Sequence, residues 1–370
     1  MDASAEFIKY DNRLKDGENN QERRRKETNM ESKRIGKQTI RLACSPCIAY
    51  FAAVGGSMEA QGPLAGGFDY LSEDSYFGAK SWESAESAML KKCLDLVLKK
   101  ADMPADALQY IFAGDLLNQC VGSEYAVKES GVPMFGLFGA CSTMAESLSL
   151  AAMTIDGGFA DRVCAMTSSH FCSAERQFRL PLAYGGQRTP TAQWTATAAG
   201  ALILNTDDTG PFVTHVTTGR IVDAGICDAA NMGSAMAPAA LETLCTHFEE
   251  TGRDPSYYDL IVTGDLGLYG HEILLDLAQG CGRDLTSVCT DCGMLIYDRD
   301  KQDVHSGGSG CGCSASVLAG HLLPKMRDGE IKRLLFAATG ALMSPTTALQ
   351  GESILGICHA VAIENSRNVD

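Results

Sequence analysis

The chain has 370 residues, 45% of them hydrophobic, and its 46 acidic against 31 basic residues give a formal net charge of -15. This length and apolar content predict a folded protein with a substantial core, and the negative charge disfavours nucleic acid and anionic lipid headgroups as partners. No stretch reaches the ~18 to 20 consecutive apolar residues of a membrane span, so we expect any membrane association to run through protein partners.

The first 37 residues are polar and densely charged, with the basic run Arg-Arg-Arg-Lys at positions 23–26 in their middle. A segment without a periodic apolar pattern cannot bury a core, which predicts a disordered tail over residues 1–37. A nucleic-acid patch in the basic run is the less favoured alternative. The composition turns apolar near Ile40, and we divide the folded chain into an N-terminal half (38–205) and a C-terminal half (206–370).

Residues 89–116 and 241–266 share one order of elements. Each segment has an amphipathic helix, a proline-bearing turn, an apolar strand and the tripeptide Gly-Asp-Leu. In each half a small-residue turn with cysteine then leads into a helix, and a further strand follows; these turns and strands fall at residues 139–153 and 161–169, and at 307–323 and 332–340. Alternating helices and short buried strands predict parallel sheets with right-handed crossovers, here as a duplicated α/β unit.

The turn of the first half reads Gly-Ala-Cys-Ser-Thr, with Cys141 directly before the helix. Thr143 and Glu146 have capping-box spacing, which predicts a helix that starts at about residue 144. The unpaired N–H groups and the positive dipole end at this point favour a thiolate or a developing oxyanion. The alternative is that Cys141 is one of fifteen cysteines and only a small buried residue.

The cysteine turn, the duplicated order and the strand "WTATAAGALIL" (194–204) are similar to those of the thiolase-fold superfamily, which includes thiolases and ketoacyl synthases. This resemblance implies two βαβαβ halves packed as a layered α/β/α/β/α core. The strings "TSSH", "AERQFR", "QRTPTAQWT" and "GGSGCGCSA" resemble, more narrowly, the stage V sporulation protein AD family of endospore-forming bacteria, over residues 40–364.

Condensing enzymes of this fold need a base and oxyanion donors besides the cysteine. Where the resemblance places their histidine or asparagine, this sequence has Asp265 in one turn and Cys311 in the next, and near their base cysteine it has Glu352. An aspartate cannot donate hydrogen bonds to an oxyanion and repels it at neutral pH. We therefore expect a pocket that binds a ligand without condensing acyl groups. The alternative is an active Cys-dependent acyltransferase, for which His271 and His305 are the candidates for a base.

The resemblance also implies a ligand: dipicolinic acid (pyridine-2,6-dicarboxylate), taken up into the developing spore either alone or as its calcium chelate. A dianion bound to an acidic protein needs local positive charge or N–H donors. Such groups are concentrated in the segment that follows the strand at 161–169, whose carboxyl end is expected to face the pocket. They are His170, Arg176, Arg179, Arg188 and Gln193. The alternative for each arginine is a solvated side chain or a pair with a surface acid. If calcium accompanies dipicolinate, Asp265 or Glu352 would supply oxygen ligands.

The expected partners follow from the same resemblance. One partner is the set of integral-membrane subunits of the spore dipicolinate transport complex, and the other is a second copy of the chain, bound through the edge of the first-half sheet. We expect the chain to be made in the cytoplasm and to associate peripherally with the spore inner membrane. A scaffold subunit of the membrane channel complex, with a vestigial pocket, is a third possible function. The Cys-x-x-Cys pairs at 44–47 and 289–292 lack a second pair at zinc-knuckle spacing, so neither a resident metal nor a cofactor is predicted. An odd number of cysteines in a long chain favours a reducing compartment over a disulfide framework.

Overall fold

Two five-stranded sheets of identical strand order, joined edge to edge into one continuous mixed sheet, form the centre of the protein. The computed structural model of the chain describes residues 33–178, 188–207 and 209–367. The first sheet has the order β5-β4-β6-β8-β2 and the second the order β12-β11-β14-β15-β9. When the five strands of each half are numbered in chain order, both sheets have the strand order 3-2-4-5-1, which confirms the predicted duplication.

The strands of each half are regular and short. Those of the first half are β2 (Cys47–Gly55), β4 (Tyr110–Gly114), β5 (Met134–Leu137), β6 (Arg162–Ser169) and β8 (Ala198–Asn205). Those of the second half are β9 (Phe212–Thr217), β11 (Leu260–Thr263), β12 (Cys289–Asp291), β14 (Arg333–Leu342) and β15 (Leu355–Glu364). Shorter strands are β1 (Thr39–Arg41), β3 (Tyr70–Leu71), β7 (Trp194–Thr195), β10 (Val222–Asp223) and β13 (Gly308–Ser309).

The prediction of parallel sheets is right for only part of each half. β4 pairs in parallel with β5 and β6, and β11 with β12 and β14, whereas β8 and β15 run antiparallel to both of their neighbours. The reason is the connection: Ser169 at the end of β6 pairs with Ala198 at the start of β8, so the chain returns at the same end of the sheet. The two sheets meet where β2 and β9 pair at Cys47 and Phe212.

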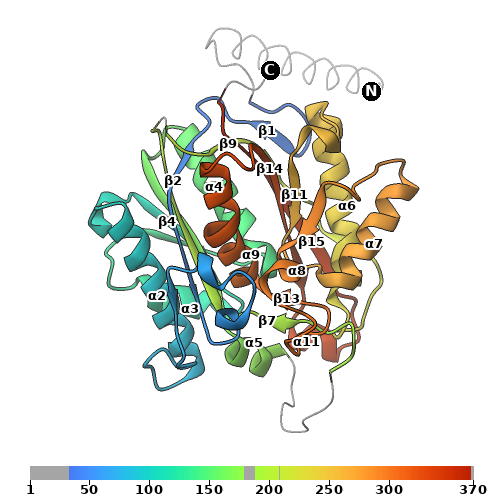
Figure 1. Cartoon of the computed structure of the whole chain (residues 1–370), viewed down its shortest axis with the longest axis horizontal. Coiled ribbons are helices and arrows are strands. Elements are labelled where there is room, and N and C mark those ends of the chain that lie inside the picture. The colour runs from blue at the N-terminus through green and yellow to red at the C-terminus, as the bar shows by residue number, and fades with distance from the viewer. Residues whose placement is uncertain (1–32, 179–187, 208, 368–370) are drawn as a thin grey trace, which may run out of the picture.

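Helices cover both outer faces and fill the space between the sheets (Figure 1). On the outer faces lie α2 (Trp82–Lys100) and α3 (Val121–Val127) in the first half, and α6 (Met232–Thr251) and α7 (Gly267–Gly280) in the second. The central layer contains α4 (Thr143–Asp156) and α9 (Cys311–Val317), which continues through a π turn (Leu318–Leu322) into α10 (Leu323–Arg327). Shorter helices are α5 (Phe171–Phe178), α8 (Cys292–Ile296) and α11 (Pro345–Leu349). Single 3-10 turns are Glu59–Gln61, Ala65–Gly67, Ala105–Ala107, Asn118–Cys120, Ala140–Ser142 and Pro255–Tyr257.

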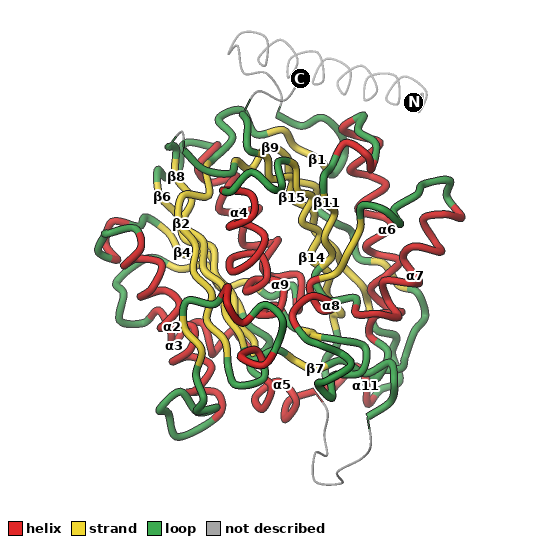
Figure 2. Tube along the Cα trace, in the orientation of Figure 1, coloured by secondary structure: helices red, strands yellow, loops and turns green. Residues whose placement is uncertain are grey.

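The apolar side chains follow this layering, so the α/β/α/β/α core is confirmed. Figure 2 shows the strands as two groups with helices between and outside them. The outer face of the first sheet packs on residues of α2 such as Met89 and Leu90, and the outer face of the second on residues of α6 such as Met236 and Leu244. The central cluster takes side chains from both halves and surrounds α4, which therefore has small and apolar residues on most sides.

The N-terminal residues that the structure describes pack on the domain. Lys33 forms an ion pair with Asp156 at 2.6 Å, and Glu250 accepts hydrogen bonds from the backbone N–H groups of Lys37 and Thr39. The first 32 residues of the predicted tail lie outside the described residues. The first half ends with β8 at Asn205, and the second begins with β9 at Phe212.

Candidate functional site

Cys141 lies in the 3-10 turn between β5 and α4, and 6% of its surface is exposed. Ala140 before it has a left-handed φ of 50°, a conformation that a residue with a side chain adopts only at some cost. Thr143 holds the turn, because its Oγ1 donates to the carbonyl of Ala140 at 2.6 Å and accepts from the backbone N–H of Gly139 at 3.0 Å. The turn thereby places Cys141 directly at the start of α4.

The predicted capping box is wrong, although the helix begins close to the expected residue. α4 starts at Thr143, and Ser142 at its N-cap makes no side-chain capping hydrogen bond; its hydroxyl donates to the Gly139 carbonyl instead, at 2.7 Å. Glu146 does not reach back to the cap, and its buried Oε2 atom has no hydrogen-bond partner within the described chain. The hydroxyl of Thr143 instead forms its hydrogen bonds within the preceding 3-10 turn, and the spacing of Thr143 and Glu146 in the sequence does not reveal this.

The surroundings of Cys141 hold its thiol in the protonated form. Burial raises its pKa well above the usual value, and the charge and hydrogen bond of Asp265 raise it further, against the smaller opposite effects of Ser309 and Gly310. The helix terminus therefore does not yield the reactive thiolate that the sequence pattern favours.

Asp265 follows β11 and is fully buried. Its Oδ2 accepts hydrogen bonds from the backbone N–H of Gly310 at 2.8 Å and from Ser309 Oγ at 3.0 Å, and its Oδ1 accepts from Thr339 Oγ1 at 3.0 Å. Burial raises the pKa of Asp265, and these hydrogen bonds, together with one from Cys141, act in the opposite direction. The carboxylate thus ties the end of β11 to β13, α9 and β14, and in its ionised form it has no proton to donate to an oxyanion.

Cys311 is the first residue of α9 and is fully buried. Its Sγ donates to the carbonyl of Ser168 at 3.0 Å, and its side chain shares one apolar cluster with Cys141, Leu116 and Ala174. The structure therefore brings Cys141, Asp265 and Cys311 together from the two halves. That they contact a ligand stays a prediction.

Three buried acids near this site were missed by the sequence reasoning. Asp291, at the end of β12, has its pKa raised to about 7 by burial. Glu86 accepts a hydrogen bond from Ser173 Oγ at 2.7 Å, and burial, followed by the charge of Asp115, raises its pKa to about 8. The repeat contained a signal for Asp115, because this residue occupies the same place after β4 as Asp265 does after β11.

A small pocket of about 50 Å³ opens beside Cys141. Its polar lining residues are Cys141, Glu175, Thr195 and Ser309, and Thr195 Oγ1 donates to Glu175 Oε1 at 3.2 Å. The described residues that line it include no lysine, arginine or histidine. The other lining residues are apolar: Leu116, Phe138, Ala140, Ala174, Phe178, Ala229, Met232, Ala341 and Met343.

Three of the four basic residues predicted to hold a dianion are described, and none of these three lines the pocket. His170 is buried, and its Nε2 lies 2.8 Å from the Ser75 carbonyl oxygen. Arg176 pairs with Glu83 on α2. Arg188 pairs with Asp303 at 3.0 Å and lies over the ring of Trp194. Arg179 lies outside the described residues.

The remaining predicted residues are also placed elsewhere. Gln193 is buried behind the site, where its Nε2 donates to the backbone carbonyls of Asp265 and Gly308 at 2.7 and 2.9 Å. Glu352 is exposed in the connection from α11 to β15. Neither His271 nor His305, the candidates for a base, lines the pocket.

The cysteines give no sign of a metal centre. All fifteen are free thiols, including both Cys-x-x-Cys pairs. Among the described residues, no group of three or more histidine, cysteine, aspartate or glutamate side chains is arranged to hold a metal ion.

The duplicated sheets with a cysteine turn before the central helix define a thiolase-like fold. In agreement, the structure is similar to that of OleA from Xanthomonas campestris with cerulenin bound, with a TM-score of 0.57 and 12% identity over 86% of this chain and 97% of that chain. A second cerulenin-bound structure of the same protein gives a TM-score of 0.54 and 14% identity over 86% and 96%.

The profile of the stage V sporulation protein AD family matches residues 36–364. The stage V sporulation protein AD of Bacillus subtilis (strain 168) is 41% identical over 334 residues, which are 90% of this chain and 98% of that protein. The chain therefore belongs to the stage V sporulation protein AD family, as the sequence motifs predict.

Proposed function

We propose that this sporulation protein binds dipicolinic acid in the pocket beside Cys141, as its calcium chelate, for uptake into the developing spore, and that it does not condense acyl groups. The observation that carries the proposal is that the cysteine turn of the condensing enzymes is present, whereas Asp265 stands where they have a histidine or asparagine. The carboxylate of Asp265, which faces the thiol of Cys141, has the wrong chemistry for acyl transfer.

The charge of the pocket favours the chelate over the free ligand. Free dipicolinate is a dianion, and the described lining offers it Glu175 and no cationic side chain. A one-to-one calcium chelate is neutral, so it escapes this repulsion, and calcium with open coordination positions accepts carboxylate oxygens as ligands. Among the described lining residues, Glu175 is the one that carries a carboxylate.

The composition of the pocket suits an aromatic ring. Phe138 and Phe178 both contribute to its wall. Aromatic rings stack on one another in offset or edge-to-face arrangements, which gives a pyridine ring a favourable surface.

The absence of acyl transfer rests on the state of the thiol. An acyl-enzyme requires the thiolate of Cys141, whereas burial and Asp265 both raise the pKa of this thiol. His271 is buried outside the pocket lining, and His305 contacts the Thr189 carbonyl at 2.6 Å.

Calorimetric titration of the full chain with dipicolinate, with and without calcium, tests the ligand. We expect saturable heat with calcium, weaker binding without it, and none with pyridine-3,5-dicarboxylate, which cannot chelate through the ring nitrogen. Glu175→Gln is expected to reduce the calcium dependence, and Glu352→Gln, at an exposed acid outside the pocket, serves as the matched control. No heat with dipicolinate under either condition would leave the scaffold function as the better account.

Incubation with acyl-CoA thioesters tests the second part of the proposal. The intact mass of the protein is expected to stay unchanged. An acyl adduct that maps to Cys141 would overturn the claim that the site is silent and would favour the acyltransferase.

We also propose a homodimer through β5 and docking onto integral-membrane subunits at the spore inner membrane. β5 is the edge strand of the first sheet, and large side chains at or near this edge stay exposed: Phe135 at 52%, Phe138 at 44% and Tyr125 at 58%. An unpaired strand edge with exposed aromatic residues is a typical pairing surface. In the described part of the chain no helix is long and apolar enough to cross a membrane.

A further inference from the structure

A second cavity, of about 530 Å³, lies where β1 pairs with β9 of the C-terminal half, and it shares no lining residue with the Cys141 pocket. β1, β9 and the segment after α6 form its walls. Its lining residues are Arg41, His215, Thr251, Gly252, Arg253, Asp254, Ser256 and Tyr257. Two arginines and a histidine thus converge on one hollow of a strongly acidic protein.

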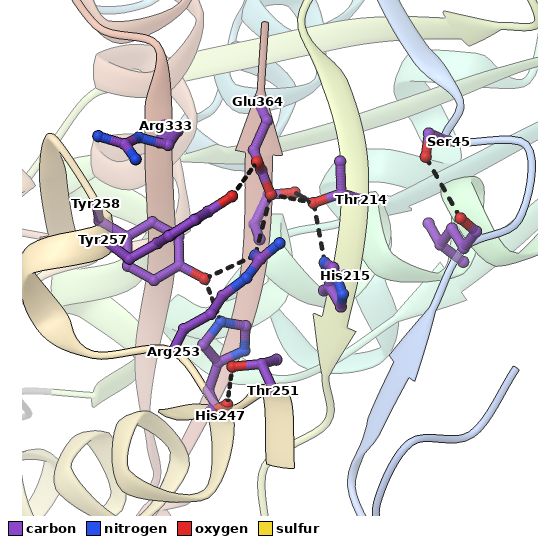
Figure 3. A network of polar contacts seen from close by, with 12 residues as sticks. Ser45, Thr214, His215, His247, Thr251, Arg253, Tyr257, Tyr258, Arg333 and Glu364 are labelled. Atoms are coloured by element: carbon purple, nitrogen blue, oxygen red, sulfur yellow. Dashed lines mark hydrogen bonds and ion pairs between the residues drawn. The ribbon is translucent and has the colours of Figure 1, made fainter. Parts of the chain in front are cut away.

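A buried polar network fixes Arg253 at this cavity (Figure 3). Glu364 accepts from Arg253 Nη1 at 3.0 Å and from Tyr257 Oη at 2.8 Å, and only 4% of its side chain is exposed. Arg253 Nη1 also donates to Tyr258 Oη at 3.1 Å. The ring of Tyr257 lies 4.3 Å from the guanidinium carbon, so the guanidinium is held on a second side. An arginine held in this way loses little side-chain entropy when a ligand binds.

The network uses only one nitrogen of the Arg253 guanidinium. Among the described residues, its hydrogen-bond partners all bind Nη1. The N–H groups of Nε and Nη2 therefore remain for a ligand, and two parallel N–H donors are the geometry that recognises a carboxylate.

His215 adds an acceptor to the same cavity. Its Nδ1 lies 3.0 Å from Thr214 Oγ1, and Thr214 in turn donates its hydroxyl proton to Glu364 at 2.6 Å. Nδ1 must therefore carry the proton of this contact, which leaves Nε2 as an acceptor without a hydrogen-bond partner among the described residues. Burial, with the charges of Arg253 and Arg41, lowers the pKa of His215 to about 3, so the ring is neutral at physiological pH.

Arg41 supplies positive charge opposite this acceptor. It pairs with His215 in the antiparallel register of β1 and β9, which places the two side chains on one face as cross-strand neighbours. Glu364 offsets the charge of Arg253, and Asp254 lines the rim, so the cavity suits one negative charge better than two.

We propose that this cavity is a binding site for a small 2-hydroxycarboxylate. The carboxylate would lie on the Arg253 Nε and Nη2 donors with Arg41 beside it, and the ligand hydroxyl would donate to Nε2 of His215. A carboxylate that lacks the hydroxyl cannot make this hydrogen bond and binds more weakly.

Histidine-selective NMR of the full chain tests the site, with lactate as the probe and propionate as the analogue that lacks the hydroxyl. The His215 ring signals, assigned with a His215→Gln variant, are expected to shift saturably with lactate and to require at least about tenfold more propionate. Arg41→Ala is expected to weaken lactate binding by at least about tenfold. Arg220→Ala removes the same charge from an exposed arginine that pairs with Glu242 on α6, and is expected to bind lactate like the wild type.

Lactate that causes no saturable shift, or that binds Arg41→Ala as tightly as the wild type, would overturn the site. Equal affinity for lactate and propionate would overturn the assigned role of His215 and with it the proposed ligand class. The thermal unfolding of Arg41→Ala, compared with that of Arg220→Ala, shows whether a loss of binding reflects a loss of fold.

Discussion

Replacement of Asp265 by alanine is expected to lower the free energy of unfolding by about 3–5 kcal/mol. Its carboxylate accepts three hydrogen bonds at 2.8–3.0 Å, from Gly310, Ser309 and Thr339, in a fully buried position. Hydrogen bonds to a charged group contribute about 1.5–3 kcal/mol each, and the cost of burying the carboxylate offsets part of their sum. Alanine also leaves the backbone N–H of Gly310 unpaired inside the protein, and this residual cost cannot be relieved by rotation of a side chain.

Asp265→Asn is the matched variant. Its amide oxygen can keep the hydrogen bonds from Gly310 and Ser309, and its amide nitrogen can donate to the hydroxyl of Thr339, so we expect a loss of only about 1 kcal/mol. Urea-induced unfolding at neutral pH, followed by circular dichroism, measures both variants. Equal stability of the alanine and asparagine variants would refute the reasoning, because it would mean that these three hydrogen bonds make no net contribution.

Three further predictions address the acids, the thiol and the dimer. Because burial raises the pKa of Asp291 to about 7, the folded chain keeps this proton at pH values where the unfolded chain, with a pKa of ~3.9, has lost it. The resulting stabilisation is complete below the unfolded pKa and falls by up to ~1.4 kcal/mol per pH unit as the pH rises toward 7. Urea unfolding across this range should show a flatter dependence of the free energy of unfolding on pH for Asp291→Asn. An unchanged dependence would count against a raised pKa. Iodoacetamide at pH 8 is expected to label Cys141 far more slowly than the exposed Cys227, as measured by peptide mass mapping, and equal labelling would contradict the protonated thiol. Phe135→Asp is expected to halve the mass found by light scattering, whereas Leu349→Asp, at a position that is 89% exposed on α11, should leave it unchanged; a wild-type monomer would disprove the dimer.

The duplication and the main site residues could be predicted because they depend on local order along the chain. Each half repeats helix, strand, turn and helix at a constant spacing, so the equivalence of Asp115 and Asp265 was readable from the repeat. Parallel strands end at a common edge, and central helices begin there, which is why Cys141, Asp265 and Cys311 meet.

The positions of the charged side chains could not be predicted, because they depend on directions that proximity in the sequence does not determine. Arg176 is close to the site along the chain, but its helix turns it toward Glu83 on α2. The prediction that Glu352 lies near the position of the enzymes' base cysteine did not allow for α11, which fills the connection before β15 and leaves this side chain exposed. Asp291 gave no pattern at all, since it ends a three-residue strand and becomes significant only through its burial and through the backbone N–H groups of Leu266 and Gly267 that donate to it in the fold.

The central helical layer has a consequence for how the protein is made. The inner face of the first sheet and α4 bury their apolar side chains in one cluster with α9, β14 and β15, which are synthesised last. A nascent chain that has reached residue 205 therefore exposes half of a core whose other half is still inside the ribosome or not yet translated. We expect such intermediates to engage chaperones until the final strand emerges, and a chain truncated between the halves to be degraded or to aggregate instead of folding as a smaller domain.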